Sequence, residues 1–343
     1  MTWTAVVTGG AGFLGSHLAK ELLRDTFPYP ECRVIVLDDL SGGFKRNIPA
    51  GAQFELCDLR DAKRVDDIIR LSRPQIVYHL AADATEGRSQ FTPKSAVGRN
   101  MVATTNLLTS SVNWGVKRFV FTSSMAVYGS QPTPLSEEME RRPEDVYGTC
   151  KAACERIIEI FGEVHGLDWT IIRPHNVYGP GQRMNDPFRN VIAIFINRAL
   201  KALPPYIYGD GQQKRAFSYI DDITRPLLEA GMHDAASKQI INLGSGEVHT
   251  INELASLVYG ERLGQNMGRY AVYVPIRPQE VLEAFCTIEK SENILGYKTK
   301  TSLQEGIQKM TAWARELGPT EMDYTVPLEI EKGAPVTWKE RLI

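Results

Sequence analysis

The chain has 343 residues, of which 43% are hydrophobic and 23% charged, a composition typical of a globular protein with one large or two modest domains. Its formal net charge of −2 and the lack of any run of eighteen apolar residues give no reason to expect nucleic acid or a membrane as a partner. The five cysteines are odd in number and lack the spacing of a metal site, so we expect no bound metal and the reduced thiols of a cytoplasmic protein.

The first predicted element is the short apolar strand Ala5–Thr8, which runs directly into the glycine-rich turn Gly9–Gly15. The helical pattern that follows has one apolar stripe, formed by Leu14, Leu18 and Leu22. A strand that enters a glycine turn and leaves as a helix is the context of a phosphate-binding turn. Gly9 allows the turn geometry, Gly12 lets the backbone approach a pyrophosphate, and Gly15 lets the helix pack close to the sheet. We therefore expect the helix N-terminus to face the phosphates of a dinucleotide.

The second predicted strand, Val34–Leu37, leads directly to Asp38, 23 residues after Gly15. An acid in this place holds the ribose hydroxyls of NAD and repels the 2′-phosphate of NADP. Lys45 and Arg46 keep NADP open as the minor alternative. The sequence therefore predicts NAD as the cofactor.

Further apolar strands alternate with helical patterns, and we expect them at residues 54–56, 76–80, 119–121, 169–172 and 240–243. This alternation predicts parallel strands with right-handed crossovers, that is, an α/β fold with a doubly wound parallel sheet of the Rossmann type. We expect residues 1–173 to form the NAD-binding domain, to which elements from about 212–243 return.

The alternation loosens after Arg173, and we expect residues 174–320 to form mainly a smaller C-terminal substrate-binding lobe over the carboxyl edge of the sheet. Capping boxes mark two helices in it, Thr250 with Glu253 and Ser302 with Glu305. The second helix is predicted to stop at Gly318 and to bury Leu303, Ile307, Met310, Ala314 and Leu317. Residues 321–343 form an extension whose role the sequence leaves open.

Tyr147 and Lys151 are the most informative pair in the chain. Their spacing places both side chains on the same face of a helix, one turn apart. A fixed ammonium beside a phenol lowers its pKa from about 10, which makes the phenol usable for proton transfer at an alcohol. Ser124, just after the strand at 119–121, supplies a hydroxyl to the same substrate oxygen. We therefore predict Ser124, Tyr147 and Lys151 to be the catalytic residues.

Together these motifs resemble the extended short-chain dehydrogenase/reductase family, and within it the NAD-dependent UDP-sugar epimerases of the UDP-glucose (UDP-galactose) 4-epimerase type. The resemblance runs from about Thr4 to Trp313. It implies that the cofactor is bound by Gly9, Gly12, Phe13, Leu14, Asp38, Asp39, Leu40, Asp58, Leu59, Leu80, Ala81, Ala82, Asn100, Tyr147 and Lys151. It implies that the substrate is bound by Ser124, Met125, Asn176, Asn190, Val191, Tyr208, Arg215, Arg277 and Glu280.

The resemblance also implies the roles of these groups. Arg215 and Arg277 would grip the diphosphate of a UDP-sugar, and Tyr208 would lie near the uracil. Tyr147 would remove the O4 proton while C4 passes a hydride to NAD⁺, and the 4-keto sugar would turn and take the hydride back. The resemblance further implies a homodimer that pairs through helices near Val102–Val112 and Ala152–Ile160.

Three alternatives stay open. A sugar-nucleotide dehydratase would carry Asp-Glu where Met125 and Ala126 stand, so it is disfavoured. An acidic UDP-sugar such as UDP-glucuronate could be bound by Arg88 or Arg183, but a loop arginine is usually solvated, and we expect neutral hexoses. Arg88 and Glu86 lie on a loop, residues 83–89, that departs from the usual pattern of the family. A non-catalytic NAD-sensing protein is the third alternative, and it is disfavoured by the catalytic trio.

Overall fold

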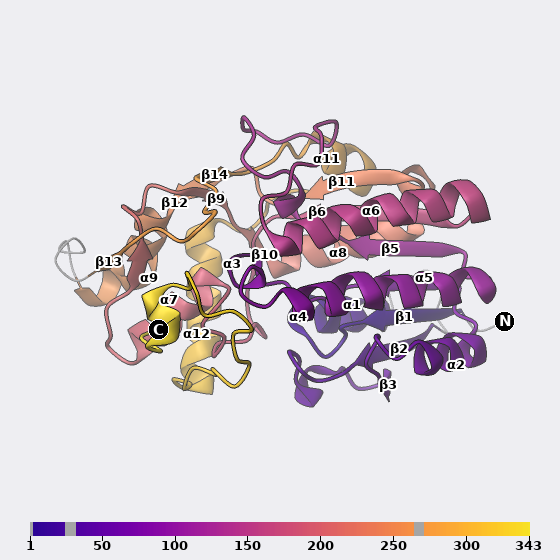
Figure 1. Cartoon of the computed structure of the whole chain (residues 1–343), viewed down its shortest axis with the longest axis horizontal. Coiled ribbons are helices and arrows are strands. Elements are labelled where there is room, and N and C mark those ends of the chain that lie inside the picture. The colour runs from indigo at the N-terminus through magenta and orange to yellow at the C-terminus, as the bar shows by residue number, and fades with distance from the viewer. Residues whose placement is uncertain (1–2, 25–31, 264–270) are drawn as a thin grey trace.

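A sheet of seven parallel strands forms the centre of the computed structural model, which describes residues 3–24, 32–263 and 271–343 (Figure 1). The strand order across the sheet is β11-β6-β5-β4-β1-β2-β3. The strands are β1 Thr4–Thr8, β2 Arg33–Asp38, β3 Gln53–Leu56, β4 Ile76–His79, β5 Arg118–Thr122, β6 Asp168–Pro174 and β11 Gln239–Leu243. Each predicted strand is present within two residues of its expected bounds, and the predicted doubly wound parallel sheet is confirmed.

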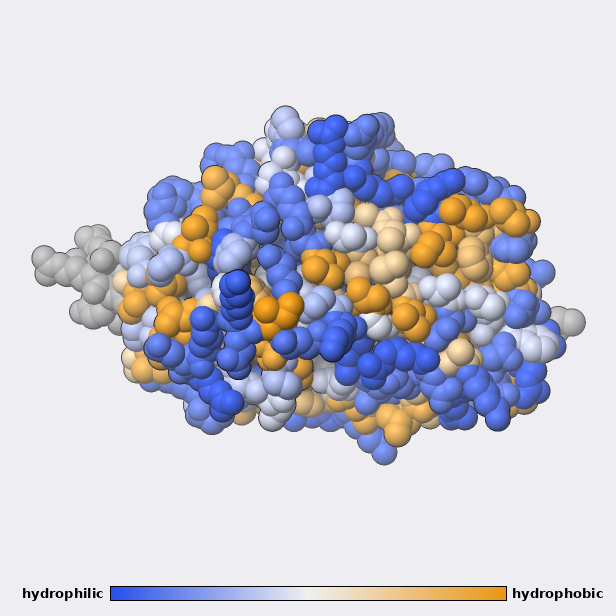
Figure 2. Space-filling model, in the orientation of Figure 1, coloured by the Kyte–Doolittle hydropathy of each residue, from blue (hydrophilic) through white to orange (hydrophobic). Residues whose placement is uncertain are grey.

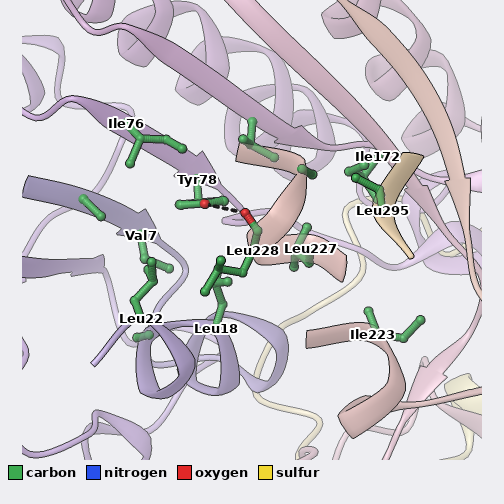
Figure 3. Packing of buried hydrophobic residues seen from close by; sticks show 14 of the residues in the cluster. Val7, Leu18, Leu22, Ile76, Tyr78, Ile172, Ile223, Leu227, Leu228 and Leu295 are labelled. Atoms are coloured by element: carbon green, nitrogen blue, oxygen red, sulfur yellow. Dashed lines mark hydrogen bonds between the residues drawn. The ribbon is translucent and has the colours of Figure 1, made fainter. Parts of the chain in front are cut away.

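Helices cover both faces of this sheet, which is why its strands are apolar along their length. One face packs against α2 (Ala62–Ser72), α5 (Ala103–Asn113) and α6 (Val146–His165). The other face packs against α1 (Phe13–Leu22), α8 (Ile220–Met232) and α11 (Glu289–Leu295). Figure 3 shows Leu18 of α1 and Leu228 of α8 directed toward the sheet, where the Tyr78 hydroxyl donates to the Leu228 carbonyl oxygen at 2.8 Å.

Short helical segments follow the carboxyl ends of the strands. They are η1 Lys45–Asn47, α3 Glu86–Ser89, α4 Pro93–Val97, η2 Gly98–Val102 and η3 Met125–Val127, whereas a further short helix, η4 Asp234–Ala236, joins α8 to the start of β11. The η2 segment is a π-helical turn that joins α4 to α5, and such turns are frequent at functional sites. The strand arrows in Figure 1 point toward a smaller lobe, so these segments lie between the sheet and the lobe.

The smaller lobe contains β7 Val177–Tyr178, α7 Val191–Leu200, β8 Tyr206–Tyr208, β9 Lys214–Ala216, β10 Ser218–Tyr219, β12 Val248–Thr250, α9 Ile251–Leu263, β13 Val272–Val274, β14 Glu283–Ala284 and α12 Leu303–Leu317. The first predicted capping box is observed in full, since Glu253 N donates to Thr250 Oγ1 at 3.1 Å and Thr250 N donates to Glu253 Oε2 at 2.9 Å. Of the second, the N-cap is observed, with Glu305 N donating to Ser302 Oγ at 3.3 Å. The prediction that Leu317 points inward is wrong, because the last residue of α12 lies beyond the lobe core and is 39% exposed.

The C-terminal segment, residues 320–343, folds back over the lobe and ends in α13 (Val336–Lys339), near the C-terminus marked in Figure 1. Its Glu329 carboxylate accepts hydrogen bonds from the backbone N–H groups of Lys94 and Ser95, at 2.8 and 2.9 Å. The segment is therefore tied to the larger domain as well as to the lobe. Among the helices in the described part of the chain, none is long and apolar enough to cross a membrane.

Candidate active site

The glycine turn after β1 forms one wall of a cavity of about 330 Å³ at the carboxyl edge of the sheet. Gly9 has a φ of +68°, and a Cβ there would lie 2.8 Å from the Ala81 backbone nitrogen, so only glycine fits. A Cβ on Gly15 would collide with the Gly9 carbonyl oxygen, which shows how tightly α1 packs on the turn. No side chain caps the N-terminus of α1, and its first turn lines the cavity, where N–H groups can bind phosphate.

Asp38 lines the same cavity at the end of β2. Its Oδ2 accepts a hydrogen bond from Ala11 N at 3.0 Å and its Oδ1 one from Leu40 N at 2.8 Å, so both oxygens are held in place. Each oxygen retains a lone pair that can accept a ribose hydroxyl. Burial raises the pKa of this carboxyl, and an added 2′-phosphate would meet it without solvent screening. The glycine cradle and this acid therefore fit NAD.

The residues predicted to bind the cofactor are almost all found in this wall. Those that line it are Gly9, Gly12, Phe13, Leu14, Asp38, Asp39, Asp58, Leu59, Leu80, Ala81, Ala82, Tyr147 and Lys151. Leu40 and Asn100 do not line it. The backbone of Leu40 orients Asp38, and the Asn100 amide is buried in the π-helical turn, where it donates to the carbonyl oxygens of Asp83 and Ala96.

We expect the purified protein to release NAD rather than NADP when it is denatured, because Asp38 disfavours a 2′-phosphate. Chromatography of the released nucleotide measures the ratio directly. The Asp38→Asn variant is expected to bind less NAD relative to NADP. Asp67→Asn serves as the matched control, since Asp67 is also paired with an arginine, Arg70, but lies on α2 and lines neither cavity. NADP as the main nucleotide of the wild type would contradict the role of Asp38.

Tyr147 and Lys151 lie in the first two turns of α6, and both buried side chains line the cavity, as their spacing predicts. Asp145 caps this helix by accepting a hydrogen bond from Gly148 N at 2.8 Å. The backbone N–H of Tyr147 donates to Ser89 Oγ at 3.0 Å, and Ser89 Oγ donates to the Glu86 carbonyl oxygen at 2.7 Å. The loop at 83–89 is therefore fixed against the start of the catalytic helix.

The Lys151 ammonium is held at the end of β5. Its Nζ donates to the Thr122 carbonyl oxygen at 2.7 Å and lies 4.5 Å from the centroid of the Phe121 ring and 5.8 Å from that of Tyr147. Burial lowers the pKa of Lys151 to about 8, so the group stays mostly protonated at pH 7. Ser124 follows the same strand and caps the η3 turn by accepting from Ala126 N at 3.1 Å.

The pKa of Tyr147 differs from the sequence prediction. Burial raises the pKa of this phenol, and the nearby Glu86 carboxylate raises it further. A hydrogen bond with the Ser124 side chain and the charge of Arg189 act in the opposite direction but do not outweigh burial. The prediction that the pKa of Tyr147 is lowered is therefore wrong for the protein without its cofactor. The same packing that places Lys151 nearby also removes water from the phenol.

A buried ion pair supports the catalytic helix from beneath. Glu155, one turn after Lys151, accepts from Arg173 Nε at 2.9 Å and from Arg173 Nη2 at 2.6 Å. Arg173 belongs to β6 and also donates to the Tyr128 hydroxyl at 2.7 Å. Removing one partner of such a pair leaves an uncompensated buried charge, so this contact fixes α6 on the sheet. The sequence analysis missed it, because neither residue lies in a recognisable motif.

A second cavity of about 260 Å³ opens beside the first, and the two share Ala84, Glu86, Met125, Asn176, Arg189 and Asn190 in their walls. Of the predicted substrate residues, this second wall contains Met125, Asn176, Asn190, Val191, Tyr208, Arg215, Arg277 and Glu280. Ser124 lines the first cavity beside Tyr147. The structure therefore brings the predicted substrate residues to one place, next to the catalytic trio.

Arg215 and Arg277 are both paired with Glu280 in this second cavity. Arg215 Nη2 lies 3.0 Å from Glu280 Oε1, and Arg277 Nε lies 2.6 Å from Glu280 Oε2. The Arg277 guanidinium also lies over the Tyr208 ring, 4.8 Å from its centroid. One carboxylate thus orients two guanidinium groups and leaves one net positive charge, which suits a diphosphate.

Arg88 and Arg183 are not solvated, contrary to the expectation for loop arginines. Arg88 is only 7% exposed, pairs with Asp83 at 3.0 Å, and lies over the Phe188 ring. Arg183 is paired with Asp323 of the C-terminal segment and lines the first cavity, not the second. The expectation of solvation is wrong because the partners, Asp83 and Asp323, are brought together only by the fold.

Glu86 was noted in the sequence only as an unusual residue, yet it lies in both cavity walls. Its side chain is exposed to the open cavity, but the surrounding protein partly desolvates the carboxyl and, together with the Asp145 charge, raises its pKa to about 7. The sequence does contain a signal for the position of Asp145, because an aspartate directly before Val146 and Tyr147 is typical of a helix N-cap. Nothing in the sequence placed Glu86 beside Tyr147.

Comparisons with known proteins agree with this geometry. The model of the NAD dependent epimerase/dehydratase family matches residues 5–244. A putative UDP-glucose 4-epimerase of Methanocaldococcus jannaschii is 35% identical over 90% of this chain and 98% of its own length. The UDP-glucose 4-epimerase of Thermotoga maritima, solved with UDP-glucose, is 33% identical with a TM-score of 0.83, covering 92% of this chain and 99% of that one. The UDP-glucose 4-epimerase of Thermus thermophilus, solved with NAD, is 33% identical with a TM-score of 0.82, covering 91% and 99%.

Proposed function

This chain belongs to the NAD-dependent epimerase/dehydratase family, and from this premise we propose that it inverts C4 of a UDP-sugar of the UDP-glucose and UDP-galactose type. The observation that carries the proposal is the place of Ser124, Tyr147 and Lys151. All three line the dinucleotide cavity, which shares part of its wall, including Met125 and Glu86, with a second cavity that presents two arginines. If Arg215 and Arg277 hold the diphosphate in the second cavity, the attached sugar would extend past the shared residues into the first cavity and reach Tyr147.

The protein groups divide the chemistry among them. Tyr147 accepts the O4 proton as C4 loses its hydride, and it returns the proton when the hydride comes back to the other face. Ser124 orients the O4 hydroxyl, and Lys151 provides a positive charge one turn away. NAD⁺, when bound in the first cavity, would supply the hydride acceptor, and its positive charge would favour the phenolate that burial otherwise disfavours.

A dehydratase would need an acid and a base directly after Ser124. Met125 and Ala126 occupy that place in η3, and neither can transfer a proton. Incubation with UDP-glucose is therefore expected to produce UDP-galactose. Formation of a 4-keto-6-deoxy sugar, or no turnover of either hexose, would contradict the proposal.

We further propose that the preferred sugar is neutral. Arg88 and Arg183 are engaged with Asp83 and Asp323, and Arg189, the cation in the shared wall, is paired with Asp186 at 2.7 Å. Glu86 places a carboxylate in that same wall, close enough to Tyr147 to raise its pKa. A uronate would therefore meet a like charge, with no unpaired arginine in the shared wall to offset it.

For the wild type at pH 8, kcat/KM for UDP-glucose is expected to exceed that for UDP-glucuronate by at least about tenfold, the effect of one like charge at close range. Glu86→Gln should narrow this ratio. Lowering the pH to 6 should also narrow it, because Glu86 becomes protonated below its pKa of about 7 while the uronate stays ionised.

The matched control for this measurement is Glu144→Gln. Glu144 also lines the second cavity, but its carboxylate is engaged by the Ser130 backbone and hydroxyl. Its replacement is expected to leave the ratio unchanged. A wild type that turns over UDP-glucuronate faster than UDP-glucose would reverse the proposed sugar preference and leave the C4 mechanism standing.

We also propose a homodimer in the cytosol. The face in Figure 2 shows hydrophobic residues gathered over α5 and α6, and exposed apolar side chains there include Val102, Ile160 and Val164. Exposed apolar patches of this kind are typical of protein interfaces. The cytosolic location is supported by the five cysteines, all of which are unpaired thiols.

Light scattering at micromolar concentration is expected to give twice the mass of the chain, and Ile160→Glu is expected to shift the protein toward the monomer. Leu282→Glu is the control, because Leu282 is equally apolar and is 60% exposed in the smaller lobe, away from α5 and α6. A monomeric wild type would contradict the dimer.

A further inference from the structure

The C-terminal segment, residues 320–343, forms part of the wall of the second cavity. Trp338 of α13 lines this cavity together with Phe188 and Tyr208. Although it lies five residues from the end of the chain, Trp338 is only 4% exposed. It packs edge-on against Phe188 at 5.4 Å and against Phe91 at 5.9 Å between ring centroids. Trp338 is therefore a fixed part of the cavity wall.

Close contacts fix the position of α13 next to Tyr208 and Arg277, two residues that are predicted to bind the nucleotide half of the substrate. The Thr337 and Tyr208 hydroxyls are joined by a 2.5 Å hydrogen bond, and Thr337 is fully buried. A Cβ on Gly87 would lie 3.4 Å from the Trp338 ring and 3.7 Å from Arg277 Nη1. Trp338, Tyr208 and Arg277, which is predicted to bind the diphosphate, therefore meet in the second cavity, whose lining does not include Tyr147.

Several contacts hold the whole segment against the rest of the protein. Asn197 Nδ2 donates to the Thr320 carbonyl oxygen at 2.8 Å, and Arg198 Nη1 donates to the Leu342 carbonyl oxygen at 3.0 Å. Arg183 pairs with Asp323, and Glu329 caps the start of α4. These contacts order the segment over its length, so the aromatic wall is in place before a ligand arrives.

Part of this chain has no counterpart in the proteins similar to it. The relatives named above are matched over 98–99% of their own length, yet they leave 8–10% of this chain without a counterpart. That share is close to the size of residues 320–343. The resemblance noted in the sequence ends near Trp313, just before this segment begins.

We propose that the C-terminal segment is a substrate-binding element in which Trp338 and Thr337 complete the wall around the nucleoside diphosphate half of the substrate. This inference rests on the proposed function. The sugar must lie near Tyr147 and the diphosphate near Arg215 and Arg277, so the end of the cavity formed by Tyr208 and Trp338 is left for the nucleoside. An indole beside a phenol provides a flat apolar surface for a base, and the linked hydroxyls of Thr337 and Tyr208 provide polar groups at its edge.

The test is the affinity for UDP, and for UDP-glucose, measured by calorimetry on the NAD-loaded protein. Trp338→Ala is expected to weaken both ligands by about tenfold or more, and Thr337→Val by a few-fold, with NAD content unchanged. Lys339→Ala, an exposed neighbour on α13, is the control and is expected to bind both ligands as the wild type does. Equal factors for the two ligands are expected, since the nucleoside diphosphate is common to both and UDP lacks only the glucosyl group.

Trp338→Leu, with Thr337→Val, decides the matter if the alanine variant is unstable, because these changes keep apolar side chains in the buried site but remove the flat ring and the hydroxyl. Unchanged UDP affinity in these two folded variants would overturn the inference. A loss confined to UDP-glucose would also overturn it, by placing the wall at the sugar. If the wild type binds no UDP, the proposed function fails and this inference with it, whereas UDP binding that is equal in wild type and variants rejects the C-terminal wall alone.

Discussion

Replacing Tyr147 with phenylalanine is expected to lower the turnover of UDP-glucose at least about 100-fold while the protein stays folded and retains NAD. The change removes one hydroxyl from a side chain that is otherwise held by packing in α6. Acid–base catalysis by a positioned side chain contributes about 10²- to 10⁴-fold, and no other group is proposed to accept the O4 proton. The measurements are the rate of UDP-galactose formation, the NAD content and the thermal unfolding temperature.

Tyr178→Phe is the matched control for this variant. Tyr178 is equally buried, its hydroxyl makes one hydrogen bond to the Leu303 carbonyl oxygen at 3.3 Å, and it lines neither cavity. Its loss is expected to alter stability slightly and turnover hardly at all. Near-normal turnover by Tyr147→Phe would reject Tyr147 as the base and direct attention to Glu86, whose carboxylate lies in the same wall.

Lys151 supports the phenolate in this scheme, and its place in the structure narrows how it can do so. Its Nζ is held by the Thr122 carbonyl oxygen, 5.8 Å from the centroid of the Tyr147 ring. At that distance the ammonium acts through its charge, and burial strengthens a charge interaction by excluding water. Its charge is present below a pKa of about 8 and is lost as the pH rises through that value. The Tyr147 phenolate would therefore be favoured by the charges of Lys151 and Arg189, and by that of NAD⁺ when the cofactor is bound.

The sequence predicted features that depend on local patterns. Strand positions followed from short apolar runs, and the turn at Gly9 followed from glycines between a strand and a helix. The common face of Tyr147 and Lys151 followed from helical spacing alone. Asp38 was identified because an acid directly after the second strand lies at the carboxyl edge of any sheet of this type. These signals need no knowledge of distant residues.

The features that the sequence did not predict depend on distant contacts. The burial of Arg88 requires Phe188, which is one hundred residues away along the chain. The raised pKa of Tyr147 results from desolvation by the assembled structure. The contact between Trp338 and Gly87 joins two segments that show no pattern in common. Tertiary packing therefore determined the electrostatics of the site, whereas local chemistry determined which residues belong to it.

Arg215→Ala and Arg277→Ala are each expected to weaken UDP binding by roughly 10- to 100-fold while changing the turnover of the saturated enzyme less than about threefold. A charge-assisted hydrogen bond contributes about 1.5–3 kcal/mol, which corresponds to this range of affinity. The contact with a diphosphate is the same before and during the reaction, so its loss raises KM and leaves kcat nearly unchanged.

The shared carboxylate makes the two variants informative together. Glu280 bridges both arginines, at 3.0 Å to Arg215 and 2.6 Å to Arg277, so removing either one leaves Glu280 to neutralise the other. The double variant should therefore lose more than the sum of the two single losses, because it leaves the Glu280 carboxylate without a cation, where it would repel the diphosphate. Arg225→Ala is the control, since Arg225 is also paired with a glutamate, Glu229, but lies on α8 and lines neither cavity. Calorimetric UDP affinities that match the wild type in both single variants would remove these arginines from the diphosphate site, and strict additivity would show that they act on the ligand independently of Glu280.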